Sequence, residues 1–138
     1  MIDLRSRALI VEDDAAARGL LGQLLESLDF AFDLAADGEE ALRFLGDQEY
    51  DVILLDIVLP KVSGIEVLES LHRHRPRLLG KVIVVTGLDV REIRSLFPAV
   101  HETLSKPVLP GRLREAVRSC VTRRGQGATI VDERITPD

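Results

Sequence analysis

The stretch Val52-Ile53-Leu54-Leu55-Asp56 decides how this chain of 138 residues folds. A run of consecutive branched aliphatic residues is typical of a strand buried on both faces, as in the middle of a parallel sheet. An aspartate follows at once, so a charged side chain stands where the strand leaves the core. The stretch therefore predicts a central strand with a carboxylate at its carboxyl end.

Similar apolar runs recur on both sides of this stretch, and each is followed by a segment with helical periodicity. The runs predict strands at residues 8–11, 30–35, 52–55, 82–85 and 102–105. The periodic segments predict helices at about 15–28, 39–45, 65–71, 90–97 and 110–124. This alternation favours an α/β fold with a parallel sheet and helices on both faces. With five such units, a flavodoxin-like, doubly wound sheet of strand order 2-1-3-4-5 is the expected topology.

The composition indicates one ordinary globular domain, which we place at residues 7–124, followed by a tail or linker at 125–138. A single cysteine, Cys120, excludes an internal disulfide. The net charge of −5 argues against direct binding of nucleic acid. No apolar run approaches the ~20 residues that cross a bilayer, and the first residues lack the apolar core of a signal peptide. We therefore expect a cytoplasmic protein that does not associate with membranes.

Polar residues stand at the ends of several predicted strands. Glu12 and Asp13 follow the first strand, and Asp56 follows the third. Thr86 ends the fourth strand, and Lys106 follows the fifth. The carboxyl ends of parallel strands share one edge of the sheet, and ligands bind where the strand order reverses, here between strands one and three. We therefore expect these side chains to meet in one cleft.

Carboxylates that meet in one cleft repel each other, so they require a cation or raised pKa values. Mg²⁺ suits such a site because it prefers oxygen and takes only one or two carboxylates beside water and phosphate oxygens. Asp13 and Asp56 are the expected direct ligands, with Glu12 acting through water and the backbone carbonyl of Val58 adding an oxygen.

An aspartate carboxylate can also attack phosphorus and form an acyl phosphate. The charge that develops on the phosphoryl group then needs a metal, a cation and hydrogen-bond donors. Beside the metal, the Lys106 ammonium is the expected cation, and the Thr86 hydroxyl is an expected donor. The strand ends therefore carry the groups that phosphorylation of Asp56 needs.

The motifs resemble those of the response-regulator receiver family, in the family's order and close to its spacing, over about residues 7–124. They are Val-Glu-Asp-Asp (11–14), Leu-Leu-Asp-Ile-Val-Leu-Pro (54–60) with Ser63-Gly64, Val-Val-Thr-Gly (84–87) and Leu-Ser-Lys-Pro (104–107).

The resemblance implies a phospho-switch rather than an enzyme. Asp56 would accept the phosphoryl group from the phosphohistidine of a sensor histidine kinase or phosphotransfer protein, or from a small phosphodonor. Glu12 and Asp13 would hold Mg²⁺, Lys106 would bind a phosphoryl oxygen, and Thr86 would turn toward it. The peptide bond between Lys106 and Pro107 would be cis.

One residue departs from the family pattern. The family has a tyrosine or phenylalanine three residues before the lysine, whereas this chain has Thr103. In the family that ring turns inward and remodels the face made by the fourth helix, fifth strand and fifth helix, where an output partner or a homodimer would dock. Thr103 cannot fill the same volume, so the output step is expected to differ.

Three other functions compete with this interpretation. A degenerate receiver would bind partners without ever carrying phosphate, and Thr103 leaves that alternative open for the output step. A haloacid-dehalogenase-like phosphatase places a second aspartate two residues after its nucleophile, where this chain has Val58. A nucleotide-binding module is disfavoured because no glycine-rich loop follows the first strand.

Overall fold

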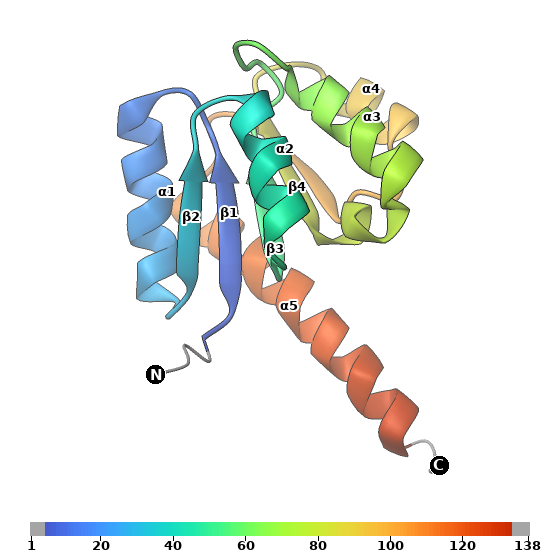
Figure 1. Cartoon of the computed structure of the whole chain (residues 1–138). Coiled ribbons are helices and arrows are strands. Elements are labelled where there is room, and N and C mark those ends of the chain that lie inside the picture. The colour runs from blue at the N-terminus through green and yellow to red at the C-terminus, as the bar shows by residue number, and fades with distance from the viewer. Residues whose placement is uncertain (1–4, 134–138) are drawn as a thin grey trace.

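A computed structural model describes residues 5–133 of the chain, with side chains up to residue 122. One five-stranded sheet of order β2-β1-β3-β4-β5 crosses the molecule, and every paired strand runs parallel (Figure 1). The strands are β1 (Arg7–Val11), β2 (Ala31–Ala35), β3 (Val52–Leu55), β4 (Val82–Thr86) and β5 (Glu102–Ser105). The predicted flavodoxin-like topology is therefore confirmed.

Helices connect the strands and cover both faces of the sheet (Figure 1). They are α1 (Ala15–Ser27), α2 (Gly38–Asp47), α3 (Gly64–His74), the short 3-10 helix η1 (Pro76–Lys81), α4 (Val90–Leu96) and α5 (Pro110–Glu133). Among them, none is both long enough and apolar enough to span a membrane.

Helix α5 is longer than the sequence predicts. It runs for 24 residues, and Figure 1 shows its last turns projecting beyond the sheet. The predicted helical end near residue 124 is therefore wrong, because residues 125–133 continue the helix. An established helix gains one backbone hydrogen bond for each added residue, so it can extend past its apolar stripe. Residues 134–138 of the predicted tail lie outside the described residues, and the domain boundary stays a prediction.

The core forms two layers because side chains alternate along each strand. On one face, strand residues pack against α2, α3 and α4. These residues are Leu9, Val11, Ile53, Leu55, Val82 and Val84. On the other face, strand residues pack against α1 and α5. These residues are Ala8, Ile10, Val52, Leu54, Ile83 and Val85. The central strands are thus covered on both faces, as their unbroken apolar runs predict.

The loops after β1 and β3 are fixed where they enter the next helix. Asp14 caps α1 by accepting a hydrogen bond from the N–H of Ala17 (2.8 Å). Ser63 begins α3 in a capping box, in which it and Glu66 each accept a hydrogen bond from the other's backbone N–H. Both loops that carry predicted site residues are therefore held by local side chains.

Candidate functional site

Hydrogen bonds continue the sheet by one residue beyond several strands, and this places the site residues. The Asp56 N–H donates to the Val11 carbonyl (3.0 Å), which aligns the end of β3 with the end of β1. At the other side of the cleft, the Lys106 N–H donates to the Thr86 carbonyl (2.8 Å). The ends of β1, β3, β4 and β5 consequently meet at one edge, and the structure brings their polar residues together.

Three carboxylates share the cleft. Oxygens of Glu12, Asp13 and Asp56 lie within 4.8 Å of one another. Glu12 and Asp56 are buried, with 3% and 7% of their surface exposed, whereas Asp13 opens to solvent. Carboxylates this close repel each other unless a cation joins them. The cluster therefore fits a hard divalent cation such as Mg²⁺, which prefers oxygen ligands. Because Asp13 is exposed, water can also reach the site, as Mg²⁺ usually requires.

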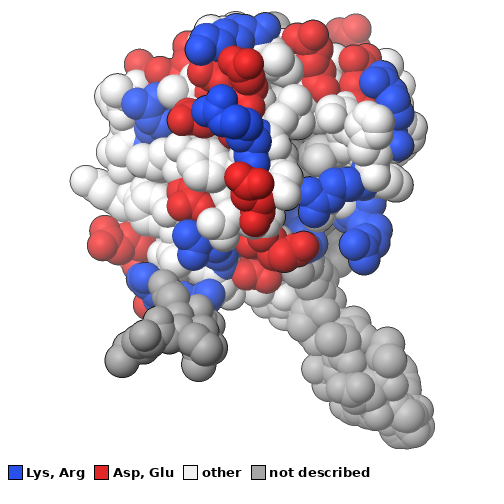
Figure 2. Space-filling model, in the orientation of Figure 1, with Lys and Arg blue, Asp and Glu red and all other residues white. Residues whose placement is uncertain are grey.

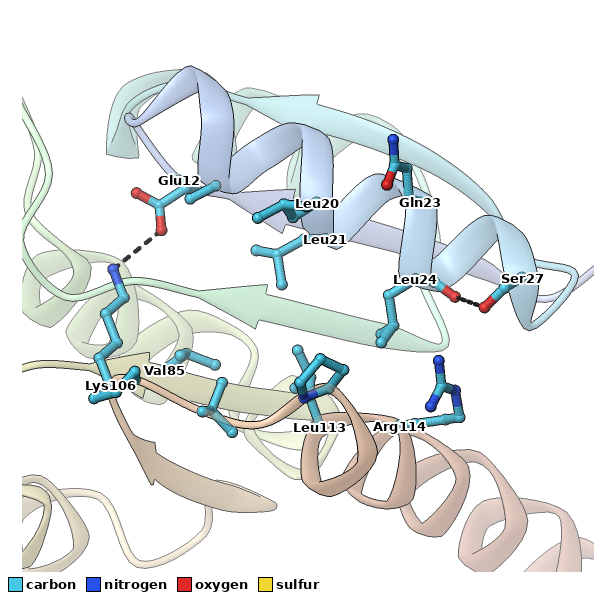
Figure 3. Close-up of a pocket in the computed structure, with 14 residues that line it drawn as sticks. Glu12, Leu20, Leu21, Gln23, Leu24, Ser27, Val85, Lys106, Leu113 and Arg114 are labelled. Atoms are coloured by element: carbon cyan, nitrogen blue, oxygen red, sulfur yellow. Dashed lines mark hydrogen bonds and ion pairs between the residues drawn. The ribbon is translucent and has the colours of Figure 1, made fainter.

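Lys106 reaches into the same cleft from the end of β5. Its Nζ lies 3.1 Å from Asp56 Oδ2 and 3.2 Å from Glu12 Oε1, and Figure 3 shows the Glu12 contact. Burial alone lowers the pKa of Lys106, but hydrogen bonds and charges from Asp56 and Glu12 outweigh burial and raise it. The lysine therefore stays charged and partly neutralises the carboxylates.

Burial raises the pKa of Glu12 above its ordinary value, and the charge of Asp56 adds to the rise. Hydrogen bonds from the Asp14 N–H (3.1 Å) and from the Lys106 ammonium oppose the rise. Burial therefore destabilises the ionised form of Glu12, and a bound cation would stabilise it.

Backbone N–H groups donate hydrogen bonds to other oxygens of the site. Asp56 Oδ1 accepts a hydrogen bond from the Val58 N–H (3.3 Å). The Thr86 hydroxyl is fully buried and accepts one from the Leu88 N–H (3.1 Å). Its turn toward a phosphoryl group and the Val58 carbonyl as a metal ligand both stay predictions. The implied cis bond between Lys106 and Pro107 is present.

Sequence reasoning missed one residue beside the site. Arg18, on the first turns of α1, donates through Nη1 to the carbonyl oxygens of Glu12 (2.9 Å) and Asp13 (3.3 Å). Its position in the sequence could have indicated this contact. Arg18 stands four residues after the capping Asp14, and helical side chains lean toward the N-terminus, so its side chain extends back over the loop before α1.

Exposed apolar side chains lie on loops that follow the strand ends. Val58, Leu88 and Leu109 stand on the loops after β3, β4 and β5, and each is largely exposed. A groove of about 570 Å³ runs from Glu12 and Lys106 between α1 and the start of α5. In Figure 3, the leucines of α1 face Val85 and Leu113 across this groove. Its apolar walls are Leu20, Leu21, Leu24, Val85, Pro107, Val108, Pro110 and Leu113.

Thr103 lies buried on β5, next to Val84 of β4 and on the side of the sheet that α4 covers. Its carbonyl accepts a hydrogen bond from Arg94 of α4 (3.0 Å), and with Phe97 it lines a hollow of about 300 Å³. The predicted difference in the output step therefore concerns a residue that is buried beside this hollow.

Charges of both signs are mixed over the face of the molecule that Figure 2 shows. On the face that Figure 2 shows, Lys and Arg side chains lie beside Asp and Glu side chains, and the coloured residues form no broad basic patch. Such a mixed surface lacks the positive stripe that usually follows a nucleic-acid backbone.

Residues 8–118 match the family described as the response regulator receiver domain. The Regulator of RpoS of Escherichia coli K12 is 36% identical over 114 residues, which make up 82% of this chain and 34% of that protein. The chain therefore spans about a third of that relative.

Solved structures of response regulators are also similar to this chain. A response regulator receiver domain protein (CheY-like) from Methanospirillum hungatei superposes with a TM-score of 0.79 at 32% identity, covering 89% of this chain and 98% of that one. TrrA of Thermotoga maritima, solved in complex with Mg²⁺-BeF, gives a TM-score of 0.73 at 29% identity, covering 83% and 98%. The chain thus belongs to the response regulator receiver domain family, and it is a receiver domain of two-component signal transduction.

Proposed function

We propose that Asp56 is the phosphoacceptor of this receiver domain. The observation that carries the proposal is the placement of its carboxylate, buried at the end of the central strand, against the Lys106 ammonium and among two further carboxylates. A carboxylate oxygen of Asp56 attacks the phosphorus of a phosphohistidine. The new P–O bond forms as the P–N bond breaks, and the bonding electron pair leaves with the imidazole nitrogen.

Glu12, Asp13 and Asp56, with the carbonyl of Val58, would hold Mg²⁺. When bound, the metal supplies positive charge to the phosphoryl oxygens. Lys106 binds a phosphoryl oxygen with the ammonium that now contacts Asp56 and Glu12. The Thr86 hydroxyl donates a hydrogen bond to a phosphoryl oxygen after turning away from the Leu88 N–H. These groups counter the charge of the transferring phosphoryl group from fixed positions at the strand ends.

The domain acts as a switch rather than as an enzyme, because the phosphoryl group ends on its own side chain. TrrA supports the proposed metal, since that relative was solved in complex with Mg²⁺-BeF. The output would leave through the face of α4, β5 and α5, where Thr103 stands, toward an output partner or a second copy.

The phosphodonor would be a sensor histidine kinase or a phosphotransfer protein, docked along the groove between α1 and the start of α5. Glu12 and Lys106 belong to both the groove and the phosphoryl site, so an occupant of the groove lies next to Asp56. Leu20 lines the groove and is 67% exposed. An apolar helix of the donor fits such walls.

Replacing Leu20 by aspartate should slow phosphotransfer from an autophosphorylated histidine kinase that labels the wild-type chain. The ratio of this rate to the rate with acetyl phosphate should fall about tenfold, because a carboxylate in an apolar docking surface costs about 1.4 kcal/mol. Leu96→Asp, at a similarly exposed leucine on α4, is the control and should leave the ratio unchanged. A Leu20→Asp variant whose ratio is no lower than that of Leu96→Asp would exclude the groove as the docking surface.

The proposed function is tested by intact-mass analysis after incubation with acetyl phosphate, with Mg²⁺ or with EDTA. We expect one phosphoryl adduct with Mg²⁺ and almost none with EDTA, because the carboxylate cluster cannot accept further negative charge without the cation. An absence of both the adduct and Mg²⁺ binding would favour the degenerate receiver. An equal adduct in EDTA would exclude the proposed metal site.

A further inference from the structure

The loop between β1 and α1 carries two of the proposed metal ligands on consecutive residues. It spans only Glu12 to Asp14, so the direction of each carboxylate depends on the backbone of this loop. The Glu12 N–H is held by the Ala35 carbonyl (3.0 Å), and the Asp14 N–H by the Glu12 carboxylate (3.1 Å). The carbonyls of Glu12 and Asp13 also need a hydrogen-bond donor.

Arg18 supplies that donor. One guanidinium nitrogen, Nη1, contacts both carbonyls, at 2.9 Å for Glu12 and 3.3 Å for Asp13. The Arg18 N–H bonds to the Asp14 carbonyl (2.9 Å), which fixes the residue on the first turns of α1. Side chains of a helix lean toward its N-terminus, so the guanidinium extends back over the loop.

The two cations beside the cleft make different contacts. Lys106 binds the carboxylates of Glu12 and Asp56 directly, so it occupies oxygens that face the metal site. Arg18 instead binds the backbone carbonyls of Glu12 and Asp13. A planar guanidinium also presents its N–H groups at fixed angles, which suits two acceptors on neighbouring residues.

We propose that Arg18 is a positioning residue that holds the backbone of Glu12 and Asp13 so that both carboxylates face a bound Mg²⁺. This inference rests on the proposed function, because it assumes the metal site described above. Groups that orient metal ligands typically change metal affinity by 10–100-fold when they are removed.

The sign of the effect separates positioning from simple electrostatics. A positive charge near a cation site repels the cation, so the loss of Arg18 would tighten Mg²⁺ binding if charge alone mattered. If Arg18 positions the loop, its loss weakens Mg²⁺ binding instead. Arg18→Met removes the donors and keeps most of the apolar stem, whereas Arg18→Lys keeps the charge and a single donor group.

The test is a Mg²⁺ titration of the whole chain, followed by two-dimensional NMR at the amides of Glu12, Asp13 and Asp56. We expect the dissociation constant for Mg²⁺ to rise about tenfold in Arg18→Met, by analogy with other groups that orient metal ligands. Arg18→Lys should lie between this variant and the wild type. Arg43→Met, which removes an exposed positive charge from α2, should match the wild type.

The same spectra before Mg²⁺ is added report on the fold and on the loop. Amide shifts of residues 12–14 should change in Arg18→Met, while those of the central strands should not. An affinity in Arg18→Met that equals or exceeds that of the wild type overturns the positioning role and leaves the proposed function intact. A wild-type chain that binds no Mg²⁺ overturns both.

Discussion

Replacing Asp56 by asparagine is expected to abolish phosphorylation by acetyl phosphate, to below the detection limit of intact-mass analysis. Asparagine has nearly the same shape, but its neutral amide is not a nucleophile toward phosphorus. The variant also loses a carboxylate from the cluster around Glu12 and Asp13, so its affinity for Mg²⁺ should fall. Thermal unfolding by circular dichroism should show a single cooperative transition, as in the wild type.

The matched control is Asp47→Asn, the same chemical change on an exposed residue at the end of α2. It should be labelled at the wild-type rate, since Asp47 lies on a helix end and not at the sheet edge that carries the carboxylates. A phosphoryl adduct that persists in Asp56→Asn would place the acceptor on another side chain. It would also remove the central step of the proposed function.

Gly64→Ala should lower the free energy of unfolding by about 3 kcal/mol, because an added methyl group meets backbone that cannot rotate away. A Cβ at this position would stand 2.4 Å from the Asp56 carbonyl oxygen and 2.6 Å from the Ile57 Cα. The Gly64 N–H also donates to the Ile57 carbonyl (2.8 Å), which holds the start of α3 against the loop that follows Asp56. Urea denaturation followed by circular dichroism measures the loss.

Gly19→Ala is the control for this substitution. Gly19 lies in α1 with open space around the position of a Cβ, and alanine favours helix over glycine. This variant should gain about 0.5–1 kcal/mol. A Gly64→Ala variant as stable as the wild type would mean that α3 can move away from β3. In that case phosphorylation of the variant should show whether Asp56 moves with it.

The strand pattern was readable from the sequence because burial on both faces leaves only apolar residues inside a central strand. The run at residues 52–55 could not be a solvent-facing strand, and the same logic located the other central strands. Parallel topology then brings the carboxyl ends to one edge. These two rules are enough to predict that Glu12, Asp56 and Lys106 lie in one cleft.

Other features depended on contacts that no periodicity encodes. The approach of Gly64 to the Asp56 carbonyl and the reach of Arg18 to its loop depend on backbone and side-chain directions. The continuation of α5 to Glu133 depends on backbone hydrogen bonds, and these leave no apolar periodicity in the sequence. Burial restricts composition, so the strands and the polar residues that follow them could be predicted from the residues alone. How those residues are held could not be predicted, because hydrogen-bond direction and close approach depend on three-dimensional position and not on residue type.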